Sequence, residues 1–174
     1  MKFLYYLLII ALTISLHTAN ASESASISID LNKKLTRGVL LKVSVHNSPV
    51  FIVYRRPNEI DVLRKQYAKV KAPVPGCEKC APSLRSISPD YLVVWGNSPS
   101  SKCALTYASS TAKDWAGHAV SGRGGFVDQC SGAEYDLSGR KLMGPKTAPK
   151  ELEIPHHILR EGIIVFDTEV ASKH

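Results

Sequence analysis

The sequence lacks the short motifs that carry chemistry in many enzymes. It has no G-x-S-x-G elbow to present a serine nucleophile, no glycine-rich phosphate loop and no convincing pair of catalytic carboxylates. It also shows no internal repeat and no low-complexity tail, and we expect no second domain. These absences argue against hydrolases and nucleotide-binding enzymes. We therefore expect a protein that is not an enzyme by itself and that has no small-molecule substrate.

A long apolar run is also missing. The N-terminal apolar stretch, from Phe3 to Leu16, is shorter than the roughly 20 residues that a membrane-spanning helix needs. Lys2 precedes it and the small-x-small triplet Ala19-Asn20-Ala21 follows, which is the pattern of a secretory signal peptide. No paired arginines of a twin-arginine signal come before it. We predict a signal peptide over residues 1–21 and one mature domain over residues 22–174, periplasmic or secreted; the alternative is a retained membrane anchor.

The basic residues lack the clustering that is typical of nucleic-acid-binding proteins. The net charge is +7, but Lys and Arg are scattered, with short pairs such as Lys33-Lys34 and Arg55-Arg56 and no interleaved aromatic residues. We interpret this pattern as a solvated basic surface and expect no nucleic-acid partner. The charge suits an acidic protein partner, and it also permits peripheral association with an anionic membrane.

The chain has four cysteines, and an even number in an exported protein indicates disulfides. Four cysteines allow three pairings, and the sequence does not choose among them. Cys77 and Cys80 form a C-x-x-C pair in a proline-rich loop, whereas thiol–disulfide oxidoreductases carry such a pair at a helix N-terminus. We expect a local structural disulfide at this pair; a redox-active site is the alternative.

Most of the chain shows the alternating or β-branched patterns that predict strands. One helix is expected between Pro57 and Pro73, because apolar residues recur there at helical spacing. Residues 96–125 are rich in Gly, Ser and Ala and predict a long ordered loop. The predicted strands cover residues 27–31, 38–45, 50–54, 91–95, 125–129, 134–137, 151–154 and 163–167, with a turn at residues 46–49.

Residues 124–140, which read GGFVDQCSGAEYDLSGR, resemble the second cluster loop of Rieske iron–sulfur proteins. In the quinol–cytochrome c reductase branch of that family the loop reads approximately GGWFCPCHGSHYDxSGR, and the spacing matches without gaps. Residues 49–60 resemble the family's PVFIRxRTxEEI segment, residues 91–105 stand where it has a strand and its first cluster loop, and residues 144–155 resemble its proline loop and closing strand. The resemblance covers roughly residues 36–167. It implies an all-β fold, a Rieske-like antiparallel β-sandwich of stacked sheets with one helix and a loop-rich tip subdomain.

The family holds a [2Fe–2S] cluster with one Cys and one His from each of two loops. The resemblance places Cys103 and Leu105 at the ligand positions of the first loop, and Asp128 and Ser131 at those of the second. Leucine offers no ligand atom, and the hard oxygen groups of Asp and Ser are poor substitutes for thiolate and imidazole. We therefore expect no cluster, no other metal and no cofactor.

The resemblance also places Cys130 at one of the two positions whose cysteines join the loops in the family; the other position is Ala108. Cys103 and Cys130 thus stand in facing loops without their usual partners, and we predict that they bond to each other. Two separate thiols, or an intermolecular bond, are the alternatives. Near the cluster position, Ala133 replaces a serine that hydrogen-bonds a cluster sulfur in the family, whereas Tyr135 retains the matching tyrosine.

In the family, the two cluster loops form an apolar, exposed tip that docks onto a partner. Here Leu105, Tyr107, Phe126 and Val127 lie in or beside these loops, and we expect them to form an interface. Our hypothesis is an exported, cluster-free, Rieske-like structural or adaptor subunit with a protein partner in the cell envelope. One alternative is an electron-transfer iron–sulfur subunit of a quinol–cytochrome c reductase-like complex. Another is a thiol–disulfide redox protein that uses the C-x-x-C pair.

Overall fold

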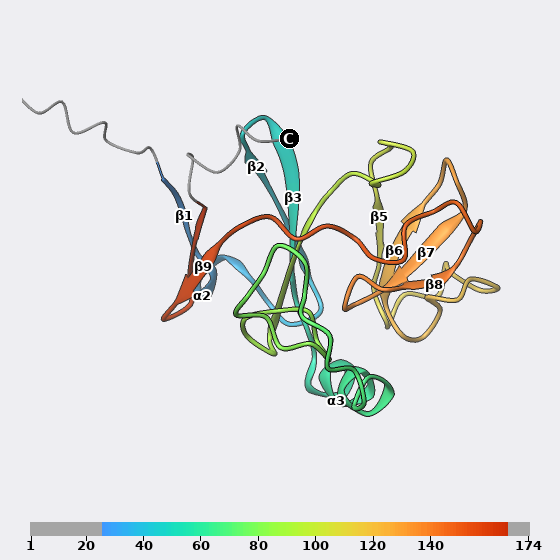
Figure 1. The fold of residues 1–174 in the computed structure, drawn as a ribbon, viewed down its shortest axis with the longest axis horizontal. Coiled ribbons are helices and arrows are strands. Elements are labelled where there is room, and N and C mark those ends of the chain that lie inside the picture. The colour runs from blue at the N-terminus through green and yellow to red at the C-terminus, as the bar shows by residue number, and fades with distance from the viewer. Residues whose placement is uncertain (1–25, 167–174) are drawn as a thin grey trace, which may run out of the picture.

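The computed structural model describes residues 26–166, so the signal peptide predicted over residues 1–21 lies outside the described residues. The described part folds into three antiparallel sheets arranged in a row (Figure 1). The middle sheet has the order β2-β3-β4, the first sheet β1-β10-β9 and the third sheet β5-β6-β7-β8. None of the helices within these residues is long and apolar enough to cross a membrane.

The described residues contain short strands and two helices. In chain order they are β1 (Ile27–Asp30), α2 (Leu31–Lys34), β2 (Leu40–Val45), β3 (Ser48–Tyr54), α3 (Pro57–Gln66), β4 (Tyr91–Trp95), β5 (Thr106–Ala108), β6 (Gly125–Asp128), β7 (Ala133–Asp136), β8 (Lys141–Met143), β9 (Ile158–Arg160) and β10 (Ile163–Phe166).

The middle sheet is buried on both faces, which explains its β-branched sequences. Successive residues of a strand point to opposite faces. In β3, Val50 and Ile52 pack into a core shared with the first sheet, and Phe51 and Val53 pack into a core shared with the third sheet and α3. The middle sheet therefore holds the two ends of the molecule together.

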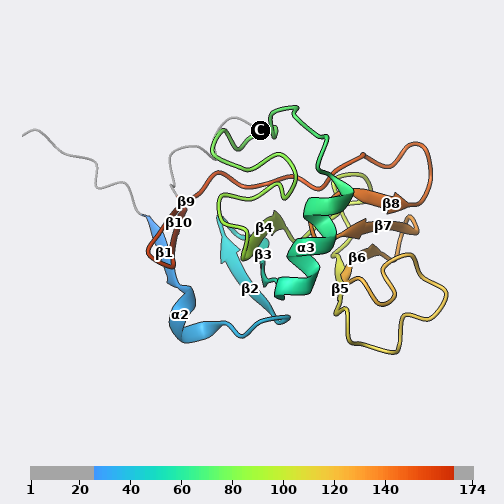
Figure 2. The same cartoon turned by 90° about the horizontal axis from the view of Figure 1, so that it is seen from below.

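The helix α3 lies alongside the junction of the middle and third sheets (Figure 2). Its first turn is stabilised by Glu59, whose carboxylate accepts a hydrogen bond from the backbone N–H of Arg56 at 2.6 Å. It ends at Gln66, earlier than the expected limit before Pro73. The next residue, Tyr67, turns its hydroxyl toward Asp136 and donates a hydrogen bond to it at 2.5 Å, which fastens the helix end to the third sheet.

The structure corrects parts of the predicted element order. Residues 151–154 form no strand, although Leu152 and Ile154 are both buried. The backbone of this segment instead bonds to two separate elements, because Leu152 N–H donates to Gly139 and Trp95 N–H donates to Glu153. Residues 96–125 are not one loop, since β5 lies within them, and α2, β8 and β9 were not predicted.

Candidate functional site

The two loops at the end of the third sheet are joined by a covalent bond. Cys103, just before β5, and Cys130, just after β6, lie at disulfide distance, with their sulfur atoms 1.96 Å apart across a sequence separation of 27. No cysteine of the described chain is free. This geometry supports the intrachain pairing expected from the sequence.

A buried carboxylate lies beside this disulfide. Asp128, at the end of β6, has no exposed surface. The Ser101 hydroxyl lies 2.9 and 2.8 Å from its two carboxylate oxygens, and the Ser131 hydroxyl donates to it at 2.5 Å. The backbone N–H of Cys130 adds a further bond at 3.0 Å. Because Ser101 comes from the first loop and Ser131 from the second, the carboxylate links the two loops.

The hydrogen bonds also decide the charge of Asp128. Burial alone raises the pKa of this carboxyl, but bonds from the hydroxyls of Ser131, Ser98 and Ser101 and from the Cys130 N–H favour the ionised form. Their sum lowers the pKa to about 2. Asp128 is therefore a carboxylate at neutral pH, and its charge is held by donors from both loops.

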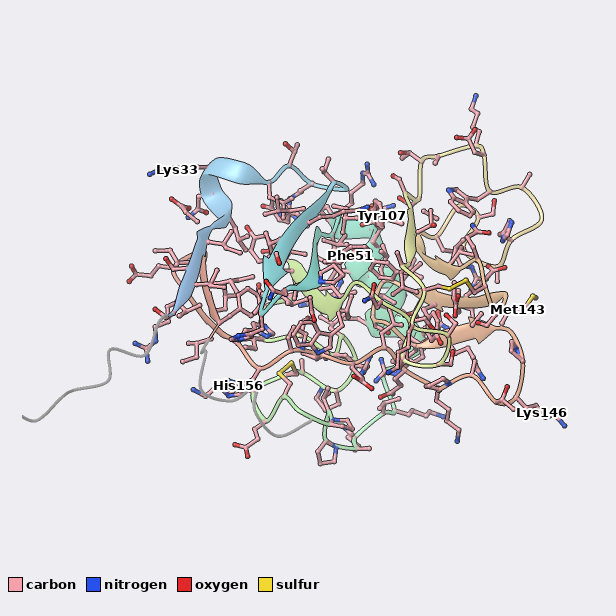
Figure 3. The ribbon with its side chains drawn as sticks, turned by 90° about the horizontal axis from the view of Figure 1, so that it is seen from above. Lys33, Phe51, Tyr107, Met143, Lys146 and His156 are labelled. Carbon is pink, nitrogen blue, oxygen red and sulfur yellow. A yellow bond between two sulfur atoms is a disulfide. The ribbon has the colours of Figure 1, made fainter. Side chains whose placement is uncertain are left out.

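The apolar residues of these loops are not exposed, and the interface expected there needs correction. Leu105 is 2% exposed, Phe126 0% and Val127 2%, while Tyr107 is partly buried. Phe126 packs between Phe51 and Tyr107, at centroid distances of 6.3 and 5.9 Å. Figure 3 shows Phe51 and Tyr107 at this junction between the middle and third sheets. These side chains build the core and offer no preformed docking surface.

A sequence signal for this burial exists. The run Gly-Phe-Val-Asp of β6 lacks the alternation of a strand with one wet face, and all four residues are buried. Met143, on β8, is an exposed apolar residue at this end of the molecule, with 56% of its surface accessible. In Figure 3 its side chain points away from the body of the protein.

Tyr135, on β7, is a buried polar group with an unsatisfied hydroxyl. Its side chain is completely buried, and the hydroxyl has no hydrogen-bond partner among residues 26–166. Burial and then the charge of Asp128 raise the pKa of this phenol, so the hydroxyl stays protonated. A buried hydroxyl without a partner costs free energy, and it serves no bond that stabilises this site.

The second disulfide lies far from these loops in the sequence. Cys77 and Cys80 have their sulfur atoms 1.97 Å apart, and they are 9% and 6% exposed. They sit in a tight turn in which Cys80 N–H donates to the Cys77 carbonyl at 3.2 Å. The pair is not at the start of a helix and is hardly accessible, which supports the structural disulfide expected from the sequence.

No protein-family model matches the chain. Among curated proteins, the ubiquinol-cytochrome c reductase iron-sulfur subunit of Allochromatium vinosum is 31% identical over 141 residues, which is 79% of this chain and 66% of the relative. The mitochondrial cytochrome b-c1 complex subunit Rieske of Neurospora crassa is 29% identical over 151 residues, or 86% of this chain and 57% of the relative. The chain belongs to the Rieske iron–sulfur protein family. A third Rieske relative, the ubiquinol-cytochrome c reductase iron-sulfur subunit of Blastochloris viridis, is 29% identical over 140 residues.

The alignments span between 57% and 67% of the lengths of these Rieske relatives. Among solved structures, a chain of "Hyperthermophilic respiratory Complex III" has a TM-score of 0.48 and 16% identity, and the match covers 94% of this chain and 90% of that one.

The residues that the resemblance assigns to the Rieske ligand positions do not fit a [2Fe–2S] cluster. Such a cluster needs two thiolates and two imidazoles. The sulfur of Cys103 is bonded to Cys130, and Leu105 is a hydrocarbon side chain buried in the core. Asp128 and Ser131 are hydrogen-bonded to each other. All four positions therefore serve interactions within the protein.

The Asp128 network predicts a pH-dependent stability. We expect Asp128→Asn to lower the free energy of unfolding by about 2 kcal/mol at neutral pH. The folded pKa of about 2 lies below the ordinary value of 3.8, so this contribution is complete above the ordinary value and is lost as the pH falls through the folded one. Urea denaturation of both proteins between about pH 5 and pH 2 should show the difference shrinking. The exposed Asp114→Asn is the control, and a difference that stays constant over this range contradicts the prediction.

The unsatisfied hydroxyl of Tyr135 predicts that a substitution there increases stability, whereas the substitution at Asp128 decreases it. Tyr135→Phe should raise the free energy of unfolding by up to about 1 kcal/mol, since it removes a buried group that has no partner. The matched control is Tyr107→Phe. The Tyr107 hydroxyl donates to the Gly38 carbonyl at 3.0 Å, so its loss should cost about 1 kcal/mol. Destabilisation by Tyr135→Phe in chemical denaturation would show that the hydroxyl has a partner after all.

Proposed function

We propose that this chain is a cluster-free Rieske-like subunit with a structural or adaptor role in a protein assembly of the cell envelope. One observation carries the proposal. Leu105, which replaces a ligand histidine, is built into the hydrophobic core, while Asp128 and Ser131 bond to each other. A disulfide and a carboxylate network brace the two loops that hold the cluster in the family.

The relatives support the general part of this proposal. Their names place them in ubiquinol–cytochrome c reductase or the cytochrome b-c1 complex, which favours a protein partner within a membrane-associated complex. The same names favour electron transfer over an adaptor role, and electron transfer is the second candidate function. Electron transfer requires cluster ligands, and Leu105 and Ser131 do not supply imidazoles. These two side chains also lack the proton-coupled chemistry of a ligand histidine.

A thiol-redox function at Cys77 and Cys80 has less support. A reactive pair needs an accessible thiolate, and both of these side chains are buried in the proline-rich loop. We infer that this disulfide stabilises the loop locally. The hypothesis of a redox site is tested by alkylation after mild reduction, because a reactive cysteine reacts rapidly near neutral pH.

Iron analysis separates the first two functions. We expect the purified protein to be colourless, to contain no stoichiometric iron and to give no Rieske signal in electron paramagnetic resonance after reduction with dithionite. About two irons per chain together with such a signal would establish the electron-transfer candidate instead. The Allochromatium vinosum relative, prepared from the same host, is the positive control for cluster assembly.

The adaptor role itself is tested by isolating the protein from its native membranes under mild conditions. We expect it to migrate in a native gel with at least one other polypeptide. If the signal peptide is removed, Edman sequencing of the recovered chain should start at Ser22. A protein that is quantitatively monomeric in every such preparation contradicts the adaptor role while leaving the iron result unaffected.

A further inference from the structure

A groove runs along the end of β4, beside the first of the two braced loops. It consists of two surface hollows, of about 510 and 400 Å³, which share the residues Trp95, Lys102 and Glu153. We call the joined hollows the Trp95 groove. One hollow extends to Gly76 and the other to Asn97. Trp95 is partly buried, because it also packs against the core between the first and middle sheets.

The walls of the Trp95 groove are fixed by backbone hydrogen bonds. Trp95 N–H donates to the Glu153 carbonyl at 3.0 Å, and Gly96 N–H donates to Pro49 at 2.7 Å. The loop that carries Lys102 is closed by the bond from Ser98 N–H to Cys103 at 2.8 Å. Cys103 in turn is held by its disulfide. The groove is therefore preorganised, which lowers the entropic cost of binding a ligand.

These same hydrogen bonds limit the kinds of ligand that the groove can bind. A peptide that adds to a sheet edge needs free backbone groups on that edge. At Trp95 the edge is already taken, because the 151–154 segment occupies it. What the groove offers is the partly buried Trp95 in its lining, with the exposed side chains of Lys102 and Glu153 beside it. Binding must therefore use side chains.

The charges in the groove select neither an anion nor a cation. Lys102 and Glu153 carry opposite charges, and the nearby Glu151 is paired with Arg85 at 3.2 Å and with Arg140 at 3.5 Å. A ligand that suits such a lining is neutral, accepts hydrogen bonds from an ammonium, donates them to a carboxylate, and has an apolar face for an indole. Sugars combine these properties, because their hydroxyls both donate and accept and their C–H faces stack on aromatic rings.

We propose that the Trp95 groove binds a neutral oligosaccharide, with one sugar ring stacked on the indole of Trp95 and neighbouring hydroxyls bonded to Lys102 and Glu153. The two hollows on either side of Trp95 accommodate the adjoining sugar units. The site adjoins the first braced loop, which supplies Lys102, and its other shared residues come from β4 and the 151–154 segment.

The chain contains two tryptophans, so fluorescence can report on one of them directly. In a Trp115→Phe variant, Trp95 is the single tryptophan, and we would titrate it with maltotriose, cellotriose and chitotriose. We expect at least one of these sugars to change the emission of Trp95 saturably, with a Kd of about 1 mM or lower. Glu153→Gln should weaken that binding roughly tenfold, because a carboxylate acceptor is lost.

Glu161→Gln, at an exposed residue outside the groove, is the matched control and should bind like the parent. Isothermal titration of Trp95→Leu should detect no binding. If that variant does not fold, Glu153→Gln still decides, because its exposed side chain leaves the backbone bond to Trp95 in place. The absence of a saturable change with all three sugars overturns the proposal, as does equal binding by Glu153→Gln. Saturable binding of a control trialanine peptide in place of the sugars also overturns it.

Discussion

The Leu105→Asp variant is expected to lose at least about 4 kcal/mol of unfolding free energy. Leu105 is 2% exposed and belongs to the core that joins the middle and third sheets. A carboxylate there is either ionised without a partner or protonated at a high cost, and both states disfavour the folded protein. A typical domain is stable by about 5–15 kcal/mol, so much of the variant should be unfolded or aggregated. Chemical denaturation followed by tryptophan fluorescence measures the loss.

Two matched variants serve as controls for the Leu105→Asp variant. Leu105→Met keeps the volume and the apolar character of the side chain, and it should cost less than about 1.5 kcal/mol. Met143→Asp places the same new charge on an exposed residue of the third sheet, and it should change stability by less than about 0.5 kcal/mol. If Leu105→Asp is as stable as the wild type, the side chain is exposed, and the apolar tip predicted from the sequence becomes a valid interface again.

Removing the loop disulfide is the second large perturbation. Cys103→Ser together with Cys130→Ser should lower the free energy of unfolding by about 3–4 kcal/mol, because the disulfide limits the unfolded chain over a sequence separation of 27. The Cys77–Cys80 bond closes a separation of only 3, so its loss costs about 2 kcal/mol in the same chain-entropy description. The comparison separates the effect of the loop brace from the general effect of losing a disulfide.

The pairing itself is checked by peptide mapping without reduction. We expect one cross-linked peptide to contain Cys103 and Cys130 and another to contain Cys77 and Cys80. A bond between Cys103 and either residue of the C-x-x-C pair would refute the brace between the loops. A free thiol at Cys103 would favour the electron-transfer candidate, since the resemblance assigns this cysteine to a ligand position. Reduction of the wild type breaks both disulfides, so it should lower the free energy of unfolding by more than the double variant does.

Local sequence patterns determined much of the framework. The run Tyr-Leu-Val-Val-Trp predicted β4 with the bounds that the structure has, and the apolar runs of β3, β6 and β10 were located within one or two residues. The turn between β2 and β3 was also expected, although it is tighter than predicted, with His46 and Asn47 at positive φ angles of 51° and 60°. Strong local propensity and clear turn chemistry made these elements readable.

Short elements and irregular segments could not be predicted from the sequence in the same way. The strands β5, β8 and β9 have three residues each, which is too few to show a period. At residues 151–154 a strand is predicted from the sequence, but the structure has none. Leu152 and Ile154 alternate into the core, so the segment has the pattern of a strand, but its backbone bonds are divided between Gly139 and Trp95. Burial produces the pattern without requiring a partner strand.

The sequence by itself predicted which groups stand at the cluster positions, because residue identity and spacing along two loops can be compared with the family's pattern without the rest of the fold. Tertiary structure decided what these groups do. Leu105 is a core residue because the middle and third sheets close over it, and Asp128 is an ionised link because serines from both loops converge on it. Arg55, one of a pair of adjacent arginines, is completely buried with its guanidinium bonded to the Leu137, Pro89 and Leu84 carbonyls, and this burial lowers its pKa to about 9. Exposure depends on contacts between residues far apart in the chain, and a local pattern does not contain them.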